Sequence, residues 1–285
     1  MSKIILVAET GSDITTELAQ RYSIQMVPMH VAFDDTTIDD GTFPAQQIVD
    51  FYKSTGRLPR TSGSTPEDFV GVFDRIHAEH PDAHILYLAY SAITTCSYQS
   101  AVIASEDRDY ITMLDTRQVS VGQAAVVVEL AKYLQANPDA TIDETVSAAN
   151  DLISRANMCF LPDNLEFLRA GGRVSNAVAL GSRILSLHPT IEILNGKLTA
   201  TKKYRGKMEK VAAQLVRDYA ETYNLSRETP LWVIYTVGLS ESVKQAVEQT
   251  ALECGFKEVE WVLAHGVITT HGGPAAIGIA GFSKA

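Results

Sequence analysis

Short runs of consecutive apolar residues, each leading into a polar loop and a helix, place the strongest constraint on the fold of this chain. The clearest are Ile4–Ala8 and Ile85–Tyr90, and Tyr110–Leu114 is another predicted strand. Met26–Phe33 is a further predicted strand, broken early by Pro28. Strands without polar alternation are typical of a sheet covered on both faces. Their alternation with helices predicts an α/β fold with a parallel sheet and crossover helices.

The second half of the chain has a different rhythm. A helix is predicted at Ala177–Leu187, and a hairpin at Thr190–Thr201. The hairpin follows from Asn195-Gly196, because this pair suits a type I′ turn. We therefore expect two domains. The N-terminal α/β domain covers residues 1–155, and the C-terminal α/β domain covers residues 156–285.

Two loops rich in Ser and Thr stand out in the first half. The first is Arg60–Asp68, in which Thr65 is the predicted N-cap and Pro66 the first helical residue. The second is Ser91–Ser100, which follows a buried strand. Ligands of open α/β sheets bind at the carboxyl ends of the strands, where we also expect Glu9–Ser12. Hydroxyls beside a helix N-terminus suit a carboxylate or a phosphate, although an ordinary capped helix would give the first loop the same sequence.

Composition excludes several classes of protein. The formal net charge is −10, which argues against a general nucleic-acid binder. The three cysteines are far apart and make no metal-ligand spacing, as in a reduced cytosolic protein. No run approaches the roughly 18 apolar residues of a membrane span. With 46% apolar residues the chain can bury a substantial core, and we expect a cytoplasmic protein.

Positive charge is concentrated in one segment, where five cations fall within residues 202–210. The following helix would have these cations at its N-terminus, where the helix dipole disfavours them. Such a segment is often only a solvated helix start. Cations that the helix dipole disfavours nevertheless indicate a role other than stabilising the fold.

No recognisable catalytic motif is present. The sequence has no Gly-x-Ser-x-Gly elbow, no Walker A motif and no His-Glu-x-x-His zinc helix. Cys96 lies at a predicted helix start, which can lower the pKa of a thiol, but it has no assigned partner base. His271 stands beside Gly272-Gly273, which would let the backbone approach a ligand. It could be a general base, a donor to a bound anion, or a structural histidine.

Several segments spread over the whole chain, in this order and spacing, resemble the DegV family, the fatty-acid-binding proteins of bacteria (FakB type). They are Thr10–Asp13, Thr61–Pro66, Thr95–Ala101, Leu165–Arg173, Lys203–Lys207 and Thr270–Ala275. The resemblance implies a two-domain DegV-like fold, with one long-chain fatty acid in a tunnel between the domains. It also implies that the protein has no catalytic turnover and no cofactor.

Family members present the carboxyl group of the fatty acid to a separate fatty acid kinase subunit, which converts it to an acyl phosphate for lipid synthesis. Lipid exchange would require at most transient membrane contact. Carried over position by position, the residues that hold the carboxylate are Thr61, Ser62, Ser91, Thr95, Ser97 and His271. The residues that engage the kinase are Arg173 and Arg205.

The sequence departs from the family pattern at four places. Ser91-Ala92 replaces the usual Ser-Ser, and Thr95-Cys96-Ser97 replaces Ser-Gly-Thr. Gly63 stands where glutamine is common, and Glu9-Thr10 where Asp-Ser is usual. Several hydroxyls remain, so lipid binding is still expected.

Two alternative functions stay open from the residues alone. One is a stand-alone acyl hydrolase or transferase that uses His271 with Ser62, Thr61 or Cys96. The other is an interaction protein whose hydroxyl loops serve only as helix caps.

Overall fold

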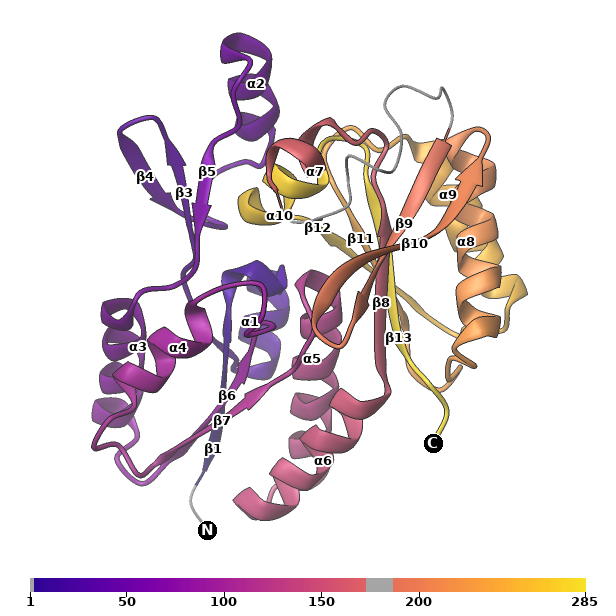
Figure 1. Ribbon diagram of the computed structural model, residues 1–285. Coiled ribbons are helices and arrows are strands. Elements are labelled where there is room, and N and C mark those ends of the chain that lie inside the picture. The colour runs from indigo at the N-terminus through magenta and orange to yellow at the C-terminus, as the bar shows by residue number, and fades with distance from the viewer. Residues whose placement is uncertain (1–2, 173–186) are drawn as a thin grey trace.

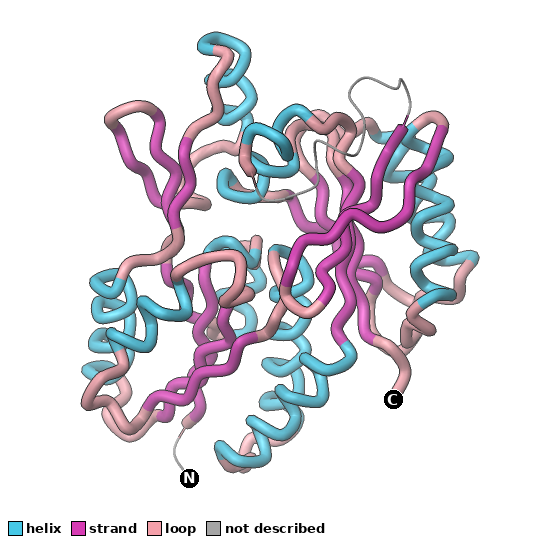
Figure 2. Tube along the Cα trace, in the orientation of Figure 1, coloured by secondary structure: helices cyan, strands magenta, loops and turns pink. Residues whose placement is uncertain are grey.

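The computed structural model describes residues 3–172 and 187–285 (Figure 1). Two main sheets are arranged around helix α5, Ser120–Ala136, which contacts strands of both (Figures 1 and 2). Eleven residues of α5 are buried, and they lie on all sides of the helix. A helix that is apolar all round belongs in a protein interior, and here it joins the two halves of the chain.

The first sheet has the strand order β2-β1-β6-β7, and all of its strand pairs are parallel. Its strands are β1 Ile4–Glu9, β2 Gln25–Val27, β6 His84–Ala89 and β7 Ile111–Asp115. The parallel α/β fold predicted from the apolar runs is confirmed.

Helices cover both faces of this sheet. On one face, α3 and α4 bury apolar side chains against the strands, and on the other face α1 and α5 do so. The helices are α1 Thr16–Tyr22, α3 Pro66–Glu79 and α4 Ser97–Ala104. Helix α3 begins as predicted, because Thr65 is its N-cap and forms a capping box with Asp68.

The second sheet is mixed, with the order β10-β9-β8-β13-β11-β12, and only β11 and β12 are paired in parallel. Helices α8 Met208–Thr222 and α9 Glu241–Glu253 cover its outer face (Figure 1). The predicted hairpin at Asn195-Gly196 is confirmed. The six strands are β8 Ala156–Leu161, β9 Leu187–Leu194, β10 Lys197–Arg205, β11 Leu231–Tyr235, β12 Val259–Leu263 and β13 Ile277–Phe282.

A small antiparallel sheet stands above the first one in Figure 1, close to two short helices of the second half. It has the order β4-β3-β5, and helix α2 follows β4 in the chain. The elements are β3 His30–Phe33, β4 Thr36–Asp39, β5 Arg60–Ser62, α2 Gln46–Thr55, α7 Glu166–Ala170 and α10 Gly266–Gly272. The remaining helices are the 3₁₀ turn η1 Thr10–Ser12 and α6 Ile142–Arg155.

Two strand predictions were wrong. Arg60–Ser62 is not loop but β5, which pairs with β3 so that Thr61 lies opposite Val31. Three polar residues are too short to show a strand period. Met26–Phe33 is not one strand but parts of two in different sheets, because Pro28 has no N–H to continue a ladder.

The helix predictions of the second half had other outcomes. Helix α10 was not predicted. Of the helix predicted at Ala177–Leu187, residues 177–186 lie outside the described part of the chain, and Leu187 begins β9. Helix α6 ends at Arg155 and β8 starts at Ala156, but the domain boundary itself stays a prediction.

Leu130→Ala should lower the free energy of unfolding by about 2–5 kcal/mol. Leu130 is fully buried in the core that α5 shares with strands of both sheets. Denaturant unfolding, followed by fluorescence of Trp232 and Trp261 in the second sheet and by circular dichroism, should give a single midpoint that moves for both signals. Leu252→Ala on α9, where 54% of the side chain is exposed, is the control and should change little. Two separate transitions, only one of them shifted, would contradict a shared core.

Candidate ligand-binding site

A cavity of about 640 Å³ is lined by residues of both halves of the chain. Its size is typical of a small-molecule site. Most of its wall is apolar, formed by Met29, Val119, Met158, Phe160, Leu198, Ile234, Val267, Ile268, Ala276 and Ile277. Its polar side chains are Thr61, Ser62, Tyr90, Thr94, Thr95, Ser120, Lys197, Tyr235, Thr236 and His271.

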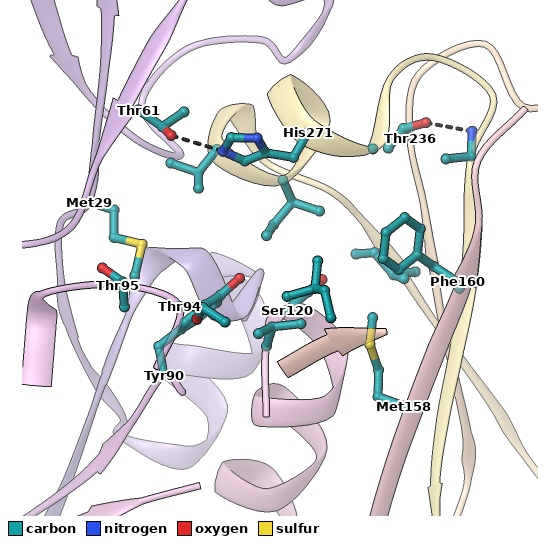
Figure 3. A pocket seen from close by; sticks show the side chains of 18 of the residues that line it. Met29, Thr61, Tyr90, Thr94, Thr95, Ser120, Met158, Phe160, Thr236 and His271 are labelled. Carbon is teal, nitrogen blue, oxygen red and sulfur yellow. Dashed lines mark hydrogen bonds between the residues drawn. The ribbon is translucent and has the colours of Figure 1, made fainter. Parts of the chain in front are cut away.

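Thr61 and His271 meet at the cavity wall although 210 positions separate them (Figure 3). Thr61 comes from β5, and His271 from the last turn of α10. Their Oγ1 and Nε2 atoms are 2.9 Å apart in a hydrogen bond. When Nε2 carries the proton and donates to Thr61, the Thr61 hydroxyl keeps its own proton for a bound anion. This pair can therefore present a neutral donor to the cavity.

Close packing against a glycine fixes the position of the His271 ring. A Cβ atom at Gly171 would lie 2.4 Å from His271 Nδ1, which no real structure tolerates. Gly171 follows α7, and α7 packs against α10. The Leu165–Arg173 segment quoted for the family resemblance thus has a physical role, because its glycine leaves room for the imidazole.

The second hydroxyl loop contacts the first directly. Ser97 Oγ accepts a hydrogen bond of 3.1 Å from the Ser64 N–H and lies 3.1 Å from Thr95 Oγ1. A Cβ atom at Gly63 would lie 2.3 Å from Thr95 Oγ1 and 2.6 Å from Ser97 Oγ. The absence of a side chain at Gly63 therefore makes room for the hydroxyls of Thr95 and Ser97.

Four of the six predicted ligand residues, Thr61, Ser62, Thr95 and His271, line the cavity. Ser91 and Ser97 are buried and are not among the lining residues. Ser91 Oγ donates to the Gly196 carbonyl at 2.8 Å and so ties its loop to the β9–β10 turn. Ser97 holds the two hydroxyl loops together.

Sequence reasoning missed several polar residues of the wall. Thr236 Oγ1 accepts a hydrogen bond of 2.8 Å from the Ala276 N–H (Figure 3). It also donates to the Gly273 carbonyl at 2.6 Å, and the two bonds order the Gly-Gly-Pro turn after α10. Ser120 begins α5, and Lys197 begins β10 directly after the Asn-Gly turn. The Asn-Gly turn, which Lys197 directly follows, was the sequence signal that could have pointed to Lys197. No local signal marked Thr236 or Ser120.

The charge of the wall suits an anion. No carboxylate is found among the described residues that line the cavity, whereas Lys197 supplies a cation. Glu9 lies nearby but is buried and accepts hydrogen bonds from Tyr87, Gln123 and the Tyr90 N–H. Burial raises the pKa of the Glu9 carboxyl, although these donors oppose the rise.

The two predicted partner residues have different outcomes. Arg205 is exposed at the end of β10, and Arg173 lies outside the described residues. In the described part of the chain, no group of three or more His, Cys, Asp or Glu side chains could hold a metal ion. Within residues 3–172 and 187–285, no helix is both long and apolar enough to cross a membrane.

The family model described as "Uncharacterised protein, DegV family" matches residues 3–284. The chain belongs to the DegV family. A DegV domain-containing protein of Deinococcus radiodurans is 27% identical over 281 residues, which is 97% of each chain. A protein of Thermotoga maritima named fatty acid-binding protein is 25% identical, over 97% of this chain and 96% of its own.

Solved structures of this family share the fold. The structure described as fatty acid binding of a DegV family protein from Thermus thermophilus has a TM-score of 0.87 and 25% identity, and it covers 99% of this chain and 100% of its own. A DegV family protein of Eubacterium eligens loaded with heptadecanoic acid has a TM-score of 0.84 over 99% and 100% of the two chains. At 18% identity this second likeness concerns the fold alone.

Gly171→Ala should displace His271 and lengthen its contact with Thr61, because the new methyl group would occupy the place of Nδ1. The His271 side-chain resonances in NMR spectra should shift. Gly71→Ala, at a helical position with nothing within 4 Å of the added atom, is the matched control. Unchanged His271 resonances in Gly171→Ala would contradict this packing.

Proposed function

We propose that the protein binds one long-chain fatty acid in the cavity, with the tail against the apolar wall and the carboxyl group at Thr61, Ser62 and His271. The observation that carries this is the Thr61–His271 pair, 2.9 Å apart on the wall of a mostly apolar cavity. The fatty acid-binding relatives from Thermotoga maritima and Thermus thermophilus support the same ligand class.

The energetics of such a ligand match this wall. Each methylene removed from water stabilises the complex by about 0.8 kcal/mol, so a dozen give on the order of 10 kcal/mol before the costs of association. A buried carboxylate needs hydrogen-bond donors in compensation. Thr61, Ser62 and Thr95 can donate without a fixed positive charge. A cradle of this kind leaves carboxylate oxygens accessible, whereas a bidentate arginine would engage both.

An accessible oxygen makes a finer proposal possible. We infer that the bound carboxyl group is presented to a separate fatty acid kinase subunit, which phosphorylates it to an acyl phosphate. The exposed cations Lys203, Arg205 and Lys207 are available for that partner. Lys202, in contrast, is engaged by Asp218 within this chain. The protein then acts as the lipid-binding subunit and performs no chemistry itself.

Thr61→Val should weaken fatty acid binding about tenfold or more, since it removes a donor to a charged group worth about 1.5–3 kcal/mol. His271→Ala should weaken binding as well, because Thr61 then loses the donor that leaves its own proton free for the anion. Native mass spectrometry of purified protein and titration with a fluorescent fatty acid measure the effect. Thr222→Val, at an exposed position of α8, is the matched control.

Wild-type protein that repeatedly carries no lipid and binds none on titration would overturn the proposed function. Hydrolysis of acyl esters by the protein alone, lost in His271→Ala, would favour the acyl hydrolase instead.

Arg205→Ala should retain bound fatty acid but slow phosphorylation of that lipid by the partner kinase. Arg205 is exposed and is absent from the cavity wall, so its loss leaves the ligand site intact. A reconstituted kinase assay with lipid-loaded protein measures the rate. Arg75→Ala on α3, which removes an exposed arginine elsewhere, is the control. Equal rates for wild type and Arg205→Ala would exclude Arg205 from the interface.

A further inference from the structure

Helix α10, which carries His271, is held at its N-terminus by two carboxylates from the first half of the chain. Asp13 Oδ1 accepts a hydrogen bond of 2.7 Å from the His265 N–H. Asp40 Oδ1 accepts one of 2.9 Å from the Val267 N–H. The first N–H groups of a helix have no partner inside it, so these carboxylates satisfy donors that would otherwise be buried and unpaired.

Asp13 has a second contact, with the cavity wall. Its Oδ2 accepts a hydrogen bond of 2.5 Å from Ser120 Oγ, and Ser120 lines the cavity and begins α5. Asp13 and Ser120 both have left-handed backbone conformations, with φ of 60° and 47°. Such conformations are costly for residues other than glycine and persist only where the surroundings impose them. The Asp13 carboxylate therefore joins η1, α5 and α10 at one point.

We propose that Asp13, assisted by Asp40, is a positioning residue that fixes α10 against the first half of the chain and thereby sets His271 opposite Thr61. Helix α10 has only seven residues, so its two ends move together. If its N-terminus moves away from Asp13 and Asp40, His271 at its other end moves relative to β5. The consequence for affinity rests on the proposed function, whereas the effect on α10 does not.

The hydrogen bonds that Asp13 and Asp40 make to α10 depend on pH, because these carboxyls and the neighbouring His265 can titrate. The side chains of Asp13, Asp40 and His265 lie together, and His265 Nδ1 is 3.9 Å from Asp13 Oδ1. Burial raises the pKa of Asp13 to about 7, while His265 and Ser120 oppose the rise. Burial also raises the pKa of Asp40. Ionised Asp13 accepts from both His265 N–H and Ser120, but protonated Asp13 needs an acceptor for its own proton.

The sign of the pH effect on stability follows from the direction of this shift. The pKa of Asp13 is higher in the folded protein than its ordinary value of 3.8, so the folded state binds the proton more tightly. The stability of wild type relative to Asp13→Asn should therefore fall as the pH rises from about 4 to about 7, and then level off. The hydrogen bond from Asp13 to α10 strengthens as the pH rises through about 7, where Asp13 ionises in the folded protein, because the ionised carboxylate is the stronger acceptor.

The experiment compares Asp13→Asn, Asp40→Asn and the exposed control Asp35→Asn, which makes the same change of charge on the β3–β4 turn. Hydrogen exchange of the amides at 265–272 should accelerate about tenfold or more in the first two variants and stay unchanged in the control. Unchanged exchange in Asp13→Asn overturns the proposal, whether or not the protein binds lipid. Wild type that binds no fatty acid overturns the proposed function alone.

Fatty acid affinity, measured from pH 6 to pH 8, shows whether Asp13 positions His271 or only stabilises the folded protein. At pH 8 Asp13→Asn should bind about tenfold more weakly than wild type, and the difference should narrow toward pH 6, where wild-type Asp13 is protonated. An affinity ratio that stays constant over this range overturns the proposal. If Asp13→Asn does not fold, Ser120→Ala removes the donor to Oδ2 that opposes the rise of the Asp13 pKa, so it should move the pH dependence of affinity to higher pH. A pH dependence that does not move in Ser120→Ala overturns the proposal.

Discussion

The packing of α5 between two sheets is the constraint on which the rest of this structure depends. Its residues from Ser120 to Ala131 are nearly all buried, so the first and second halves of the chain must enclose this part of the helix together. That enclosure brings β5 and α10 to the same cavity, and Thr61 reaches His271 across 210 positions. Neither half alone supplies both the hydroxyls and the imidazole. The site is therefore a property of the joined halves.

The first half of the site could be predicted from local patterns. Apolar runs gave β1, β6 and β7, and the N-cap signature at Thr65 fixed the start of α3. Since parallel strands bring their carboxyl ends to one edge, the hydroxyl loops were expected to lie close together, and the 3.1 Å contact between Ser64 N and Ser97 Oγ shows that they do. The Asn-Gly turn likewise gave the β9–β10 hairpin.

The rest depended on contacts that no local pattern records. Helix α10 lies between glycines and has no N-cap side chain of its own, and its donors are satisfied by Asp13 and Asp40 from far earlier in the chain. The family pattern suggested that Ser97 would face the ligand. Its hydroxyl instead accepts the Ser64 N–H, and the missing Cβ of Gly63 makes that approach possible. A glycine on one loop thus makes room for a side chain on the other.

An acidic chain can bind an anion if its carboxylates are kept away from the wall of the binding site. The formal net charge is −10, and three carboxyls, of Glu9, Asp13 and Asp40, are buried in the same half as the hydroxyl loops. None of them lines the cavity, and each accepts hydrogen bonds from backbone or side-chain donors.

Burial raises the pKa of all three carboxyls. Their oxygens accept hydrogen bonds that hold Tyr90, Ser120 and α10 in place. These carboxyls would repel an anionic ligand if they lined the cavity. Buried behind the lining residues, they position the wall instead.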